Sequence, residues 1–116
     1  MSDTAIAGVF PVLPTPFDEQ GRPDVPVLRR LVNYLIHCGV DGLTYPGVAS
    51  EVGQLSTQEQ LELTAVVLKE AAGRVPVIAG ASHPEVSTTI DLAAVACAQG
   101  AAALMVAVPA ERKGAA

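Results

Sequence analysis

Four short apolar runs recur along this chain at intervals of about thirty residues, with one helical pattern between each pair. The strand-like runs are Val9–Leu13, Leu43–Tyr45, Val75–Ala79 and Leu104–Val108. They are apolar at nearly every position, which is typical of strands covered on both faces in a parallel sheet. Connections of this length between parallel strands are right-handed βαβ crossovers. The repeat therefore predicts a parallel α/β fold.

Three amphipathic patterns fill the intervals and predict helices. Their apolar stripes are Leu28, Leu31, Val32, Leu35 and Ile36, then Leu61, Thr64, Ala65, Leu68, Ala71 and Ala72, then Val86, Ile90, Ala93, Ala94 and Cys97. A glycine follows each stripe, where a left-handed residue commonly ends a helix. Ser56 and Glu59 predict a capping box for the second helix. No linker or change in composition divides the chain, so residues 1–116 are expected to form one domain.

Charge and composition exclude several classes of protein. The chain has a net charge of -5, and its seven basic residues are scattered. No basic patch is therefore available to bind the phosphates of a nucleic acid, and we expect no nucleic-acid partner. No apolar run approaches about 18 residues and no signal-peptide pattern opens the chain, so we expect no membrane partner and a cytoplasmic location. Cys38 and Cys97 lie in helical patterns and are predicted to be free, buried thiols, with no metal site.

The segment Gly39–Glu59 reads as a helix stop, a short strand, a glycine-flanked loop and a helix start. This order places the loop Gly47–Leu55 at the carboxyl end of a strand, where α/β folds bind their ligands. The first strand is not followed by GxGxxG, so the loop is not part of a Rossmann fingerprint. Periodicity alone does not separate a doubly wound sheet from a (β/α)8 barrel.

Four segments follow one another in the order and spacing of a known family. They are residues 11–24, 28–43, 47–59 and 73–80, and they include Thr15-Pro16-Phe17 and the run RVPVIAG. In series they resemble the dihydrodipicolinate synthase / N-acetylneuraminate lyase family of class I, pyruvate-handling aldolases. The resemblance implies a partial (β/α)8 TIM barrel, with about the first four strands and three helices in this N-terminal portion. It also implies a homo-oligomer and no cofactor, with the Schiff base formed by a lysine on the sixth strand and protons relayed by a tyrosine from the fifth strand.

The family's carboxylate-binding loop, glycine–threonine–threonine–glycine–glutamate, corresponds here to Gly47, Val48, Ala49, Ser50 and Glu51. These five residues are the predicted substrate-binding residues, for a 2-keto acid. Two threonines are replaced by residues without a hydroxyl, and each lost hydrogen bond to an anion costs about 1.5–3 kcal/mol. The Ser50 hydroxyl is a partial substitute one position late. The departure favours a keto acid other than pyruvate, or no turnover.

No catalytic residue of the family is expected within this chain. Lys69 lies within the second helical pattern beside Glu70 and reads as a surface lysine, and Lys113 lies in a charged triplet. A Schiff-base lysine needs a pocket that keeps its amine neutral, which neither position indicates. Pro109 is followed by Ala110 where the family often has a tyrosine pair.

Several polar residues have two interpretations each. Glu51 is a loop anchor or a catalytic acid, and Tyr45 points into the site or fills the core with its hydroxyl satisfied at the rim. His83 is an exposed loop residue or a substrate contact, and His37 complements the dipole of the first helix. The stretch Asp18–Asp24 reads as a polar turn without the spacing of a metal site.

Two functions from different classes remain open. In the first, the chain is the N-terminal fragment of a lyase or aldolase that acts on pyruvate or another 2-keto acid through a Schiff base in the full-length protein. In the second, it is a non-catalytic half-barrel module that associates with itself or with a partner through its unpaired strand edges.

Overall fold

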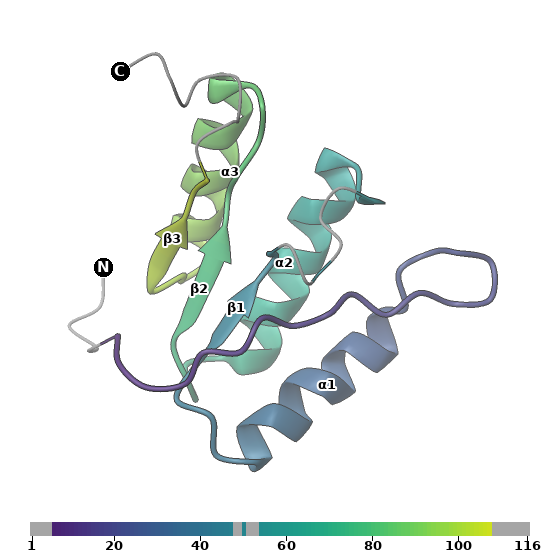
Figure 1. The fold of residues 1–116 in the computed structure, drawn as a ribbon, viewed down its shortest axis with the longest axis vertical. Helices are drawn as coiled ribbons and strands as arrows, with labels where there is room; N and C mark the ends of the chain where they lie inside the picture. The colour runs from purple at the N-terminus through teal and green to yellow at the C-terminus, as the bar shows by residue number, and fades with distance from the viewer. Residues whose placement is uncertain (1–5, 48–49, 51–53, 108–116) are drawn as a thin grey trace.

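The computed structural model describes residues 6–47, 50 and 54–107. Its helices are α1 (Val25–His37), α2 (Thr57–Ala71) and α3 (Val86–Ala98), and its strands are β1 (Leu43–Tyr45), β2 (Val77–Gly80) and β3 (Ala103–Met105). The three helices are confirmed, and strand and helix alternate as the repeat predicts (Figure 1). None of the helices in this part of the chain is long and apolar enough to cross a membrane.

The strands form one parallel sheet in the sequential order β1-β2-β3. Tyr45 pairs with Ala79, which in turn pairs with Leu104. Because every right-handed crossover steps in the same direction along the sheet, the helices all lie on one face (Figure 1). A doubly wound sheet reverses its strand order to cover both faces, and the described strands contain no reversal.

The expected first strand, Val9–Leu13, runs beside β1 but forms only an isolated parallel bridge between Val12 and Thr44. Backbone bonds of 3.0 Å join the Thr44 amide to the Pro11 carbonyl and the Leu13 amide to the Thr44 carbonyl. The prediction of a fourth full strand is therefore wrong for the described residues. Proline has no amide hydrogen to give a ladder, and Pro11 and Pro14 flank the bridge.

Helix α1 follows its predicted stripe. Leu28 and Val32 are buried, and Leu31, Leu35 and Ile36 pack against the core beside them. The Asp24 side chain caps the helix by accepting from the Val27 amide at 3.2 Å, and a proline occupies the first turn. This face buries α1 against the sheet and α2.

Helix α2 begins with the predicted capping box. The Ser56 hydroxyl accepts from the Glu59 amide at 3.1 Å, and the Glu59 carboxylate accepts from the Ser56 amide at 2.9 Å. Its buried residues are Gln60, Leu63, Thr64, Val67, Leu68 and Ala71. The predicted stripe shares Thr64, Leu68 and Ala71 with this set. Its other members are less buried: Leu61 and Ala65 are half-buried, and Ala72 is exposed at the helix end. The glycines after all three helices have positive φ, as predicted.

Helix α3 buries a different face from the predicted one. Leu92 and Ala96 are its buried residues, whereas Val86 and Ile90 are exposed. The sequence VSTTIDLAAVACA is apolar around most of the helix, so periodicity does not select a face. Both cysteines, Cys38 and Cys97, are exposed free thiols, so the prediction that they are buried is wrong.

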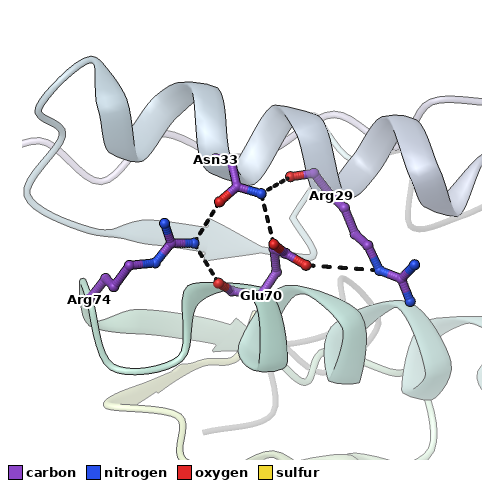
Figure 2. Close-up of polar contacts among 4 residues, drawn as sticks. All are labelled: Arg29, Asn33, Glu70 and Arg74. Atoms are coloured by element: carbon purple, nitrogen blue, oxygen red, sulfur yellow. Dashed lines mark hydrogen bonds and ion pairs between the residues drawn. The ribbon is translucent and has the colours of Figure 1, made fainter.

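A polar network joins α1 to the end of α2 (Figure 2). The Asn33 side-chain amide donates to the Glu70 carboxylate at 2.7 Å, and the Arg74 guanidinium donates to the Asn33 side-chain oxygen at 2.7 Å. Arg74 also donates to the Glu70 carbonyl at 2.6 Å, which satisfies a group at the helix end. Arg29 lies 3.9 Å from the Glu70 carboxylate, and its side chain is 53% exposed. Asn33 is therefore the centre of the network.

Replacing Asn33 with alanine is expected to lower the free energy of unfolding by about 1–2 kcal/mol, because bonds to two charged side chains are lost. Replacing Arg29 with alanine is expected to cost less than about 1 kcal/mol, since a half-exposed ion pair is screened by water. Urea unfolding of both variants checks the order. A larger loss in the Arg29 variant would contradict this account of the network.

Candidate functional site

The candidate site lies at the carboxyl end of the sheet, where β1 leads through Pro46 into the loop that precedes α2 (Figure 1). Gly47 and Ser50 are the two predicted binding residues that the structure describes, and both are buried. Val48, Ala49 and Glu51 lie outside the described residues, so the two interpretations of Glu51 stay open.

The Ser50 side chain is fully buried and both of its hydrogen-bonding functions are used. Its hydroxyl donates to the Leu13 carbonyl and accepts from the Gly47 amide at 3.0 Å. The Ser50 amide in turn donates to the Gly47 carbonyl at 3.0 Å. Ser50 therefore ties the loop to the chain segment before α1, 37 residues away. The Ser50 hydroxyl is thus engaged within the protein, and its role as a substrate ligand stays a prediction.

Replacing Ser50 with alanine is expected to destabilise the protein by about 2 kcal/mol. The change leaves the Gly47 amide and the Leu13 carbonyl buried without their partner, and an orphaned buried group costs about 1–3 kcal/mol. Urea unfolding measures the loss, and hydrogen exchange should speed up at the Gly47 amide. Ser87 is exposed on α3, so the Ser87→Ala variant is the matched control and should change little. Equal stabilities for the two variants would argue against the anchor.

Tyr45 belongs to the core between the sheet and the helices. Its side chain is fully buried in the cluster that contains Leu13 and Leu43, and its hydroxyl lies 2.7 Å from the Thr15 hydroxyl. Burial raises the pKa of Tyr45, and the hydrogen bond between its hydroxyl and that of Thr15 partly offsets this rise. Of its two interpretations, core filler with a satisfied hydroxyl is the one that holds. The sequence marks Thr15 only as part of a motif and does not indicate this pairing.

The opposite face of the sheet presents an apolar wall beside the loop, formed by Val12, Gly47 and Met105. A methyl group built on Gly47 would lie 2.9 Å from the Val12 side chain and 3.5 Å from the terminal methyl of Met105. Gly80 pairs with Met105 in the sheet. Because Gly80 has no side chain, nothing from this position separates Met105 from Gly47. Sequence reasoning missed Val12 and Met105 as site residues, because only the strand register brings them to the loop.

The two histidine candidates lie beside helix ends. The His83 ring accepts from the Glu85 amide at 3.0 Å, and its carbonyl accepts from the Thr89 hydroxyl at 3.3 Å, so His83 shapes the turn before α3. Its Nδ1 atom is the acceptor, which places the proton of the neutral ring on Nε2. His37 is exposed in the last turn of α1, as predicted.

The remaining charged candidates do not meet at the site. Lys69 is exposed on α2, and Lys113 lies outside the described residues. The Asp18 carboxylate accepts from the amides of Gln20 and Arg22, each at 2.9 Å, and so closes the predicted polar turn. Among the residues that the structure describes, no group of three His, Cys, Asp or Glu side chains is placed to hold a metal ion.

A parallel sheet in sequential order, with helices on one face and a glycine-led loop at its carboxyl edge, is the arrangement of the singly wound α/β enzymes. The model of the dihydrodipicolinate synthetase family matches residues 5–115. The chain therefore belongs to this family, as the sequence resemblance predicted.

Individual relatives support the assignment. The chain is 40% identical over 104 residues to a 4-hydroxy-tetrahydrodipicolinate synthase of Methylococcus capsulatus, covering 90% of this chain and 36% of the relative. The prophage protein YagE of E. coli K12, solved in complex with pyruvate, has a TM-score of 0.84 at 31% identity, over 89% of this chain and 35% of that one. An N-acetylneuraminate lyase of Mycoplasma synoviae has a TM-score of 0.82 at 30% identity, over 85% and 34%. The chain thus spans about a third of the length of the relatives that it matches.

Proposed function

We propose that this chain is the N-terminal part of a lyase or aldolase whose full-length form is a (β/α)8 barrel acting on pyruvate or another 2-keto acid through a Schiff base. The observation that carries the proposal is the position of the loop that starts at Gly47. It leaves the carboxyl end of β1, and Ser50 bonds it to the Leu13 carbonyl. Family membership and the pyruvate complex of a relative support a keto acid as the ligand.

The described part of the loop offers a keto acid neither a free hydroxyl nor an activating group. Backbone amides in a strand-end loop bind carboxylates, but the Gly47 and Ser50 amides are already paired within the loop. The electrophilic step needs a neutral amine, and Lys69 is an exposed lysine on a helix surface. The lysine and the relay tyrosine of the family are therefore assigned to later strands of a full-length protein, which we expect to be a cytoplasmic homo-oligomer without a cofactor.

Borohydride trapping with pyruvate tests both halves of the proposal. The 116-residue chain alone is expected to keep its intact mass, because no lysine in it matches the family's nucleophile. A longer protein that continues this sequence through further strand–helix units is expected to gain one reduced pyruvate adduct on a strand-end lysine. An adduct on Lys69 or Lys113 of the short chain would overturn the assignment of the nucleophile, and no adduct in the longer protein would overturn the Schiff base.

The second candidate function is a half-barrel module that associates through its sheet, and one observation favours it. In the described part of the chain β3 pairs only with β2, and Leu104, Met105 and Val106 are 37%, 40% and 52% exposed. Exposed apolar strand edges pair readily with other chains. Light scattering that finds a stable mass of about twice 11.9 kDa would favour this function, and a monomer with a cooperative melt would weaken it.

A further inference from the structure

One side of α3 carries an apolar stripe that the described part of the chain leaves exposed. Val86 and Ile90 are 52% and 61% exposed, and Ala94 and Cys97 continue the stripe at helical spacing and are exposed as well. Val95, on another side of the helix, lines a cavity that α3 shares with α2. The stripe therefore lies on the side of α3 that faces away from α2.

Strand β3, which contacts α3, has an open edge. Among the described strands it pairs only with β2, at one side of the sheet (Figure 1). The Met105 carbonyl accepts from the Ala81 amide at 3.0 Å, so Met105 directs its backbone groups to β2. Backbone groups alternate in direction along a strand, so those of Leu104 point to the open edge. The Leu104 side chain lies on the helix side of the sheet, because its partner Ala79 belongs to the core.

The other edge of the described sheet is a poor partner for β3. It is formed by the segment around Val12, which makes only an isolated bridge and is flanked by Pro11 and Pro14. Proline has no amide hydrogen, so this edge would give a second copy few ladder bonds. Strand β3 contains no proline. Its best-matched partner is β3 of a second copy, paired antiparallel about a twofold axis.

A twofold axis beside Leu104, perpendicular to the sheet, also brings the two α3 helices together. Helix α3 spans the crossover from β2 to β3, so the two helices would lie about two strand spacings apart, roughly 10 Å, which is a distance at which helices pack. Both helices lie on the same face of the joined sheet, and their stripes face each other. They run antiparallel, so their dipoles are complementary, and the one charged residue within α3, Asp91, lies off the stripe.

We infer that the 116-residue chain forms a twofold dimer in which β3 pairs antiparallel with β3 of a second copy and the two α3 stripes pack together. The inference deepens the second candidate function and rests on it. Val86, Ile90 and Leu104 would each bury on the order of 50 Å². This area is small beside that of a standard interface, so the dimer is expected to dissociate on dilution.

Disulfide trapping tests the twofold pairing. The two native cysteines are exposed, so Cys38→Ser and Cys97→Ser provide a background without thiols. In this background Leu104→Cys places two thiols opposite each other across the axis, at a Cα separation of about 5.5 Å, which a disulfide spans. Val9→Cys, which is on the other edge and 64% exposed, is the matched control. Under mild oxidation the Leu104→Cys dimer is expected to form at least about tenfold faster, because pairing raises the local thiol concentration.

A charge at the axis provides a second test. Leu104→Lys in the otherwise unchanged chain is expected to raise the dissociation constant of the dimer at least about tenfold, measured by light scattering over a concentration series. Val9→Lys, on the other edge, is expected to leave this constant unchanged. Leu104 and Val9 are both more than one-third exposed, so neither change should unfold the chain, and circular dichroism checks this.

The outcomes separate the inference from the function on which it rests. A chain that stays monomeric over the whole series would overturn both. A chain that dimerises while Leu104→Cys reacts no faster than Val9→Cys would overturn the pairing of β3 and leave self-association standing. Disulfides that form fastest in a mixture of these two variants would show that β3 pairs with the other edge, which also overturns the twofold dimer.

Discussion

Replacing Gly80 with alanine is expected to lower the free energy of unfolding by at least about 3 kcal/mol, the upper end of the range for overpacked sites. A methyl group on Gly80 would overlap the carbonyl oxygen of Pro46 and lie 3.0 Å from its carbonyl carbon. Both are backbone atoms that directly follow β1, so they cannot move aside as a flexible side chain can. Relief of the overlap requires β2 to shift away from β1, which breaks the pairing of Tyr45 with Ala79.

Gly73→Ala is the matched control for this prediction. Nothing lies within 4 Å of a methyl group built on Gly73, but its φ is +78°. The control therefore measures the cost of the left-handed conformation alone, about 1–2 kcal/mol. Urea unfolding of both variants checks the difference. A Gly80 variant no less stable than the Gly73 variant would show that β1 and β2 can separate at little cost.

Replacing Tyr45 with alanine is expected to cost about 3–5 kcal/mol, the range for removing a large aromatic residue from a core. Tyr45 is fully buried and is the largest of the fully buried side chains that the structure describes. The change also leaves the Thr15 hydroxyl without its partner. The other tyrosine, Tyr34, is 65% exposed, so Tyr34→Ala is the matched control and should change stability by less than about 0.5 kcal/mol. Similar losses in the two variants would contradict the core position of Tyr45.

Tyr45→Phe separates the hydroxyl from the ring. The cost should be about 1 kcal/mol, since the ring stays and one hydrogen bond is lost. In the native protein the pKa of Tyr45 is raised by burial, so the folded state holds this proton more tightly than the unfolded state. The stability linked to this proton is therefore complete below about pH 10 and is lost as the pH rises further. Chemical unfolding from pH 9 to 11 should show a shallower loss in Tyr45→Phe than in the native protein.

The sequence predicts the repeat, the three helices and their ends from local physics. A capping box requires only that Ser56 and Glu59 lie three residues apart. A glycine can end a helix because its own backbone adopts the left-handed conformation. For the same reason the stripe of α1 is predicted correctly, since its apolar residues occupy one face. The buried face of α3 and the exposure of Cys97 are not predictable in this way, because this helix is apolar on several sides and its packing partners decide which side is buried.

In the candidate loop, too, some features follow from the local sequence and others depend on tertiary contacts. The order of strand, glycine, loop and helix predicts that the loop Gly47–Glu51 lies at the carboxyl edge of the sheet, and the sequence motifs identify the family. The use of Ser50 as an anchor depends on the Leu13 carbonyl, 37 residues earlier in the chain. The pairing of Tyr45 with Thr15 spans 30 residues. Whether a hydroxyl is free for a ligand is therefore a property of contacts that local sequence does not encode.

The sequence by itself determined the lineage of this protein, its alternation of strand and helix and the position of the candidate loop after β1, because spacing and capping act within a few residues. Only the tertiary structure decided which side chains lie beside this loop. The register of β1, β2 and β3 brings Met105 beside Gly47, and the alternation of side chains across the sheet turns Tyr45 toward the helices. Both depend on pairing between segments more than twenty residues apart.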